Sequence, residues 1–212
     1  MGRQSFVWSC NFMSSNTVGR PREFDIDDAL QKALNVFWNK GYEGTSLPDL
    51  TKAMGINRPS IYSTFGNKEQ LFLKAVELYE SQVGGFFYPS LNEPTAYKVA
   101  ERILLGAAAE YGNPHNPKGC MMVQSALACS DSGQSVKNEL IARRQMGYSR
   151  LVVRFQEAVT SGDLDNDTDP EALAAFILTV VQGLSIQATN GACAMQLHKV
   201  AIVALQAFTS FK

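Results

Sequence analysis

The sequence predicts an all-α protein with a small N-terminal domain and a larger helical C-terminal domain. Closely spaced helix starts, each with its own capping residue, occupy residues 45–71, and from residue 95 onward apolar side chains recur at helical spacing. No segment alternates apolar and polar residues as a strand does. Glycine and proline interrupt the helical pattern within 80–94. We therefore expect an extension without ordered structure at 1–18, a first domain at 19–80 and a second at 81–212.

The first helix is expected at Asp25–Lys40, where Asp25 can cap the N-terminus. Its apolar residues form one broad stripe made of Ala29, Leu30, Ala33, Leu34, Phe37 and Trp38. A stripe of this length can support the two short helices that follow it.

A helix-turn-helix pattern follows this first helix. Ser46 and Asp49 have the spacing of a capping box, and Gly55 ends the short helix that they begin. Asn57 caps a second short helix, with Pro59 in its first turn, and Asn67 caps a third. Two helices joined by about three to four residues that include a glycine are typical of a helix-turn-helix, whose second helix enters the major groove of DNA.

The run GINRPSIYSTFGNKEQL, residues 55–71, resembles the core of the TetR family of bacterial repressors. That family shows a glycine, a short recognition helix with the order aliphatic–Tyr–x–x–Phe, and a Lys-Glu-x-Leu start to the next helix. The resemblance is dense over about residues 25–80. It implies a DNA-binding transcriptional regulator with a helical ligand-binding and dimerisation domain, and most simply a repressor that leaves a palindromic operator when a small molecule binds.

The candidate DNA contacts divide into residues that position the protein and residues that read bases. Tyr62 and Lys68 match family positions that touch phosphates, and an arm that carries Arg20 and Arg22 can lie along DNA or remain a solvated tail. Arg58 can pair with guanine or, alternatively, with phosphate. The full expected set is Arg20, Arg22, Thr45, Ser46, Arg58, Pro59, Ser60, Tyr62, Thr64 and Lys68.

The net charge of −1 gives no support to DNA binding. Residues 1–80 hold nine Lys or Arg and nine Asp or Glu, so the argument depends on where individual cations lie. The chain is 45% hydrophobic, which allows a sizeable core, and its apolar run at 172–186 is shorter than the about twenty residues of a membrane span. Four cysteines without CxxC spacing predict reduced thiols in a cytoplasmic protein.

The C-terminal helices are expected to hold an effector cavity and a dimer interface. The candidate wall residues, each of which can instead be ordinary core, are Tyr111, Met121, Met122, Gln124, Tyr148, Phe155 and Phe176. The last two helices are apolar around much of their circumference, which predicts pairing with a second copy. The expected interface is Phe176, Val180, Gly183, Leu184, Gln187, Leu197, Val200, Ala201, Ala204, Leu205 and Phe208.

Three alternatives remain from the sequence. Cys120 lies near a helix N-terminus, so a thiol-responsive regulator is one of them, and His115 with Cys120 is a weak metal pair. A DNA-binding module without an inducer is another. An enzyme is the third, but no nucleophile elbow, phosphate-binding loop or zinc-protease motif is present. We expect no catalytic residues, no cofactor and no resident metal.

Overall fold

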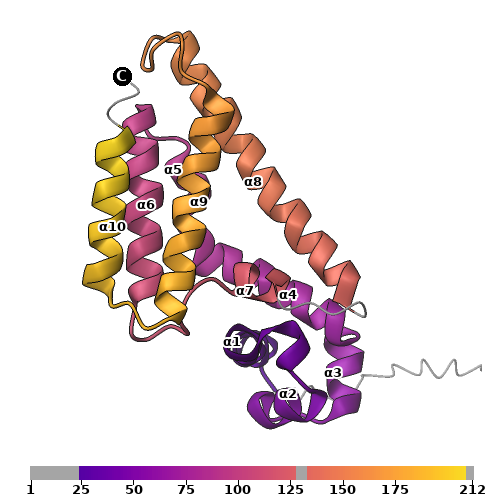
Figure 1. Cartoon of the computed structure of the whole chain (residues 1–212). Coiled ribbons are helices and arrows are strands. Elements are labelled where there is room, and N and C mark those ends of the chain that lie inside the picture. The colour runs from indigo at the N-terminus through magenta and orange to yellow at the C-terminus, as the bar shows by residue number, and fades with distance from the viewer. Residues whose placement is uncertain (1–23, 128–132, 209–212) are drawn as a thin grey trace, which may run out of the picture.

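The computed structural model describes residues 24–127 and 133–208, and this part of the chain is helical without any strand. Figure 1 shows the N-terminal helices gathered at one end of the molecule and the C-terminal helices extending away from them. The elements are α1 (Ile26–Gly44), α2 (Leu47–Met54), α3 (Arg58–Phe65), α4 (Lys68–Gln82), the 3-10 helix η1 (Gly84–Phe86), α5 (Phe87–Ser90), α6 (Ala96–Gly112), α7 (Met121–Leu127), α8 (Gln134–Thr160), α9 (Pro170–Thr189) and α10 (Ala194–Phe208).

Side-chain caps begin the N-terminal helices where the sequence predicted them. The Asp25 carboxylate accepts from the Asp27 and Asp28 amides at 2.8 and 3.1 Å. Both capping boxes are formed: Ser46 pairs with Asp49 before α2, and Asn67 pairs with Gln70 before α4. Because each cap satisfies backbone donors that lack a helical partner, local hydrogen bonds determine where these helices begin.

The first helix extends beyond its predicted end at Lys40. Gly41 takes φ +70°, a left-handed conformation that ends the regular helix, and a further helical turn then reaches Gly44. This kink lets the chain turn toward α2. The expected extension at 1–18 and the arm residues Arg20 and Arg22 lie outside the described residues.

Aromatic contacts hold α1 against α4 and form the core of the N-terminal helices. Phe72 on α4 meets both Phe37 and Tyr42 edge to face, each at 5.1 Å between ring centroids. Trp38, the residue after Phe37, meets Tyr79, which lies two turns after Phe72 on α4, at 4.9 Å. Such geometry adds to the burial energy of the rings, so α4 is firmly attached to the helices before it.

The C-terminal helices pack around α6. Both α9 and α10 contact α6, and α8 lies against α9 (Figure 1). By length and composition α9 is apolar enough to cross a membrane, but one side of it is buried in this fold, including Leu173, Ala174 and Ile177. The apolar run is thus a core helix that also presents apolar residues at the surface.

Candidate nucleic-acid interface and internal cavity

The outer face of α3 carries three of the ten predicted DNA contacts. Ile61 and Phe65 are buried, as their four-residue spacing predicted, and this turns the opposite face of the helix outward. Arg58 and Pro59 are exposed there, and Tyr62 retains 50% of its surface. The face therefore combines a guanidinium, a phenol and an apolar ring on one short helix. Ser63, outside the predicted set, is also exposed on this helix.

Three further predicted contacts are partly buried beside this face. Ser60 and Thr64 are half-buried on α3, and Thr64 borders a groove that α1 and α4 also line. The Lys68 ammonium stands 4.3 Å from the centre of the Tyr42 ring. Burial lowers the pKa of Lys68, and the charge of Glu43 acts in the opposite direction. Lys68 is thus held at the start of α4 by an aromatic face.

Thr45 and Ser46 differ from the sequence expectation of hydroxyl donors to DNA. Thr45 is buried, and its hydroxyl donates to the Gly41 carbonyl at 2.7 Å. The Ser46 hydroxyl donates to the Asp49 carboxylate at 2.7 Å and accepts from the Asp49 amide. Both hydroxyl protons are therefore used within the capping of α1 and α2, so we leave these residues out of the proposed contact set.

Asp49 organises this cap together with Lys40. The Lys40 ammonium lies 2.6 Å from the carboxylate, and its hydrogen bond, followed by those from Ser46, holds the pKa of Asp49 well below its usual range. Because the pKa is lowered on folding, the stabilisation by this carboxylate is present above the unfolded pKa and is lost as the pH falls through the folded one.

A cavity opens among α4, the η1–α5 segment, α6, α7, α8 and α9. The empty space within it, counted together with its open mouth, is about 800 Å³. Its wall is largely aromatic and aliphatic with a few charged groups: Tyr79, Glu80, Gly84, Phe86, Phe87, Tyr88, Tyr111, Cys120, Met122, Val123, Arg143, Arg144, Gly147, Tyr148, Leu178, Val181 and Gln182.

Of the seven predicted wall residues, Tyr111, Met122 and Tyr148 line this cavity. Phe155 is on the same face of α8 as Tyr148 but two turns further on, where Phe208 packs against its ring at 5.8 Å. Gln124 donates to the Lys118 carbonyl at 2.6 Å. Met121 is fully buried in the core, and Phe176 is partly buried against it. These four side chains do not line the cavity. Phe155, Met121 and Phe176 pack within the core, and Gln124 is hydrogen-bonded to the backbone.

The sequence reasoning missed the contributions of α4 and the η1–α5 segment. Tyr79 and Glu80 come from the end of the predicted first domain, and Phe86, Phe87 and Tyr88 come from the predicted boundary region at 80–94. The apolar run at Phe86–Tyr88 was the available signal. It cannot by itself indicate that these rings meet α8 and α9, which lie far away in the sequence.

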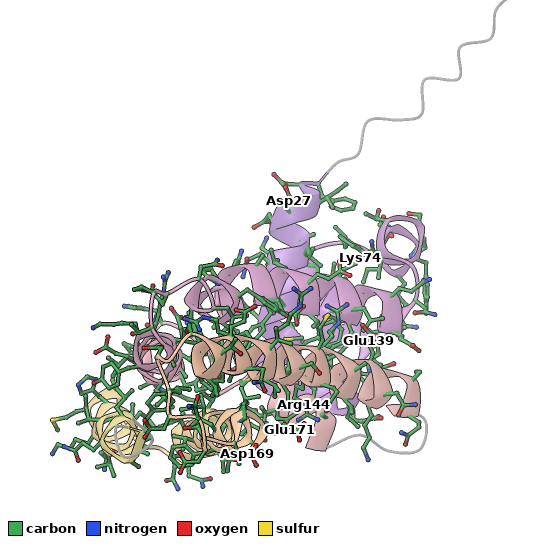
Figure 2. All side chains as sticks on the ribbon, turned by 90° about the horizontal axis from the view of Figure 1, so that it is seen from above. Asp27, Lys74, Glu139, Arg144, Asp169 and Glu171 are labelled. Carbon is green, nitrogen blue, oxygen red and sulfur yellow. The ribbon has the colours of Figure 1, made fainter. Side chains whose placement is uncertain are left out.

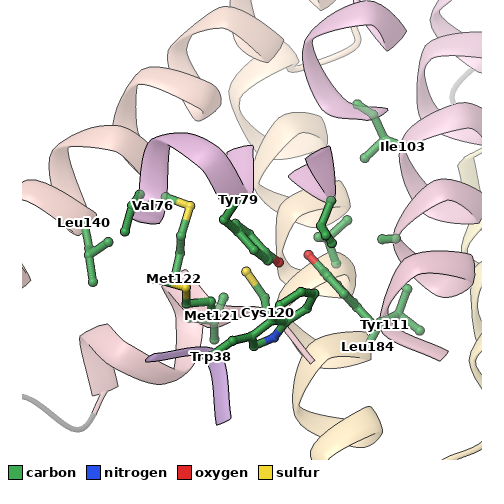
Figure 3. Close-up of a cluster of buried hydrophobic side chains, with 14 of the residues drawn as sticks. Trp38, Val76, Tyr79, Ile103, Tyr111, Cys120, Met121, Met122, Leu140 and Leu184 are labelled. Carbon is green, nitrogen blue, oxygen red and sulfur yellow. The ribbon is translucent and has the colours of Figure 1, made fainter. Parts of the chain in front are cut away.

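Cys120 lies in the cavity wall between two buried tyrosines. Figure 3 shows the hydroxyl ends of Tyr79 and Tyr111 directed toward its sulfur. Burial, followed by the influence of Cys120, raises the pKa of both phenols well above the usual value, so both are neutral hydrogen-bond donors. The Cys120 amide donates to the Ser185 hydroxyl at 2.7 Å.

The segment before Cys120 also contacts the N-terminal helices. The Trp38 indole N–H donates to the Gly119 carbonyl at 3.0 Å, in a buried position. Trp38 also packs on Tyr79, and both are close to Cys120 (Figure 3). Tyr79 in the cavity wall is therefore in direct contact with Trp38, a side chain of α1.

An ion-pair cluster joins α4 to α8 at the cavity wall. Arg143 contacts Glu80 at 2.6 Å, Glu139 at 2.7 Å and Glu77 at 3.6 Å, each through a different nitrogen of its guanidinium. Burial opposes the charge of Arg143, but the hydrogen bonds to Glu139 and Glu80 raise its pKa overall. This cluster links the helix that carries the N-terminal core to the longest helix of the C-terminal part.

Some residues of the predicted subunit interface are buried within the single chain, and others are exposed or half-buried. Six of its members point into the core of the single chain: Leu184, Leu197, Ala201, Ala204, Leu205 and Phe208. They lie on the sides of α9 and α10 that pack within the chain, mainly against α6, which corrects the expectation that they meet a partner. Gly183, Gln187 and Val200 are exposed, and Phe176 and Val180 are half-buried.

The exposed sides of α9 and α10 nevertheless carry large apolar residues. Val203, Val200, Ile202 and Ile186 keep 63%, 47%, 37% and 37% of their surface exposed, and Met195 keeps 64%. Nothing lies within 4 Å of a Cβ built on Gly183, so this part of α9 is open to close approach. We call these six residues the α9–α10 apolar face. An apolar face of this kind on a single chain indicates an interaction surface.

No group of three or more His, Cys, Asp or Glu side chains suited to a metal occurs within 24–127 and 133–208. Cys129 falls outside these ranges. His115 is exposed and its amide is bonded to the Asn113 side chain, while Cys120 is buried in the cavity wall.

Models of known protein families match both the N-terminal and the C-terminal part of the chain. The model of the bacterial regulatory proteins of the tetR family matches residues 29–75, and that of the tetracyclin repressor-like C-terminal domain matches 101–198. The chain is 31% identical to the HTH-type transcriptional repressor ComR of Escherichia coli K12 over 185 residues, covering 86% of this chain and 88% of ComR. It is 32% identical to the HTH-type transcriptional regulator YezE of Bacillus subtilis over 162 residues, covering 76% and 84% of the two chains.

Among solved structures, the fold matches a cysteine mutant of the TetR family transcriptional regulator CifR in complex with a 26 bp double-strand operator DNA. The TM-score is 0.85 at 39% identity, and the match covers 89% of this chain and 99% of CifR.

Proposed function

Because the chain belongs to the TetR family of bacterial transcriptional regulators, we propose that it is a repressor released from a palindromic operator when a small molecule enters its cavity. Members of this family are regulatory DNA-binding proteins, and we expect no enzymatic activity. The observation that supports the release mechanism is that α4 reaches both the helix-turn-helix core and the cavity. Its Leu71 and Phe72 lie in the core of the helix-turn-helix domain, while its Tyr79 and Glu80 line the cavity.

On the DNA side, α3 is the recognition helix. Arg58 and Pro59 at its N-terminus face outward, where the first residues of a recognition helix meet base edges. Tyr62, Ser60, Thr64 and Lys68 are the proposed phosphate contacts, and Arg20 and Arg22 the proposed arm contacts. The domain division remains 19–80 for DNA binding and 81–212 for ligand binding and dimerisation, supported by the two family-model matches.

A homodimer follows from the α9–α10 apolar face. Two copies joined there would form a four-helix interface and present two recognition helices to a two-fold operator, whose half-sites lie about 34–36 Å apart. A cytoplasmic location is the corresponding proposal, since the partner is bacterial DNA.

Release by a ligand is a coupling between the cavity and the spacing of the two recognition helices. A molecule against Tyr79 and Glu80 changes the packing of the C-terminal half of α4, and the helix transmits this change to Phe72 and the core around it. Such couplings amount to about 1–3 kcal/mol, which is a roughly 5–150-fold change in operator affinity.

Replacing Arg58 with alanine tests the DNA-reading role. We expect Arg58→Ala to weaken binding to the cognate palindrome by roughly 1–3 kcal/mol and to relax preference at one base pair, because a bidentate contact to guanine is lost. Lys68→Ala is the comparison: it should weaken binding to all sequences and reduce the salt slope by about one unit. Fluorescence anisotropy with cognate and scrambled duplexes measures both. Equal losses on the two duplexes for Arg58→Ala would assign Arg58 to the phosphates.

A thiol response is the second candidate, favoured by the position of Cys120 in the cavity wall beside two neutral phenols. If it operates, N-ethylmaleimide should add one mass equivalent at Cys120 and abolish operator binding, because the adduct occupies the space next to Tyr79 and Trp38. Cys120→Ser should remain active after treatment. Cys193, which is exposed, provides the matched variant: Cys193→Ser should stay sensitive. Undiminished binding by a chain shown by mass spectrometry to be modified at Cys120 would exclude this response.

A further inference from the structure

The cavity wall carries a cation without a counter-ion among the residues that the structure describes. Arg144 follows Arg143 on α8, is half-buried and lines the cavity. Arg143 is fully engaged by Glu77, Glu80 and Glu139. Arg144 makes no hydrogen bond or ion pair with any residue in 24–127 or 133–208. Figure 2 shows it on the side of α8 that faces the start of α9.

The rest of the wall suits a flat apolar body. Tyr79 and Tyr111 stand at the inner end, Phe86 and Phe87 enter from the η1–α5 segment, and Tyr148 lies one turn from Arg144 on α8. Aromatic side chains bind other rings edge to face or stacked, and they gain most when the ligand is planar. A guanidinium at the border of such a wall supplies the one strong polar contact that fixes orientation.

We propose that the cavity binds an aromatic carboxylate, with its ring among these aromatic side chains and its carboxylate on Arg144. The proposal rests on the proposed function in taking this cavity as the effector site. A carboxylate matches the planar guanidinium with two parallel hydrogen bonds.

Charge at the wall limits the ligand to one negative charge. The charged side chains that line the cavity are Glu80, Arg143 and Arg144, so the wall carries one net positive charge, which disfavours a cationic ligand. Glu80 and Arg143 are paired with each other, so a second negative charge on the ligand would find no unpaired cation in the wall and would lie near the Glu80 carboxylate. A single carboxylate directed at Arg144 avoids both costs, since the apolar part of the molecule occupies the space between.

Isothermal titration calorimetry of the full-length dimer with 2-naphthoate and its neutral analogue 2-naphthamide tests this inference. We expect the acid to bind about tenfold to a hundredfold more tightly than the amide, because one charge-assisted contact distinguishes them. Arg144→Gln should remove that difference by weakening the acid alone. Arg150→Gln is the matched control, as Arg150 is exposed on the same helix and does not line the cavity.

The outcomes separate this inference from the proposed function. Equal affinity of acid and amide, an Arg144→Gln variant that binds the acid as tightly as the parent, or no binding of either compound would overturn the aromatic carboxylate. Acid binding that depends on Arg144 but is identical with and without operator DNA would support the ligand class and refute release by that ligand. Weaker acid binding in the presence of operator, by the factor by which the acid weakens operator binding, would support both.

Discussion

Val203→Glu is expected to leave each chain folded and to split the dimer. Val203 keeps 63% of its surface exposed on α10, so a glutamate there meets solvent in the monomer and costs little. In the proposed dimer, the two-fold interface would bury one unpaired carboxylate from each copy. This would weaken association by roughly 3–5 kcal/mol. Light scattering should report a monomer at concentrations where the parent is a dimer, and operator affinity should fall steeply because each monomer contacts only one half-site.

Two other variants make this result interpretable. Val153→Glu changes an equally apolar residue on α8, which is 57% exposed and lies outside the proposed interface, so it should remain dimeric. Ala201→Glu, at a position that is fully buried within the chain, should unfold the protein rather than divide it. A Val203→Glu protein that remains dimeric with unchanged operator affinity would place the interface elsewhere, and a monomeric Val153→Glu protein would place it on α8.

Phe72→Ala is expected to lower the free energy of unfolding by roughly 3–5 kcal/mol. Phe72 is fully buried and is the ring that both Phe37 and Tyr42 contact, so its loss leaves a cavity and removes two edge-to-face contacts. Chemical denaturation followed by circular dichroism measures the change.

Tyr62→Ala supplies the stability control for this variant. Tyr62 is half-exposed, so replacing it with alanine should lower the free energy of unfolding by less than about 0.5 kcal/mol, although the variant should bind DNA more weakly. A Phe72→Ala protein with parental stability would mean that the α1–α4 aromatic contacts contribute little, and α4 would then be a poor route between cavity and DNA.

The helix-turn-helix could be predicted from the sequence because its determinants are local. A cap such as Ser46 with Asp49, or Asn67 with Gln70, depends on hydrogen bonds between residues three apart. The inward pair Ile61 and Phe65 depends on one helical turn. These interactions are complete within each short segment, so a pattern of residue types is enough to indicate them.

The cavity and the α9–α10 apolar face were decided only by the tertiary structure. Tyr79, Phe86, Arg144 and Leu178 become neighbours only when α4, the η1–α5 segment, α8 and α9 cross, and no local pattern determines that crossing. The α10 helix is apolar on two sides, so its periodicity could not choose which side meets α6 and which meets solvent. Packing made that choice by burying Ala201 and leaving Val203 exposed, because the first fits against a neighbouring helix and the second lies on the opposite side.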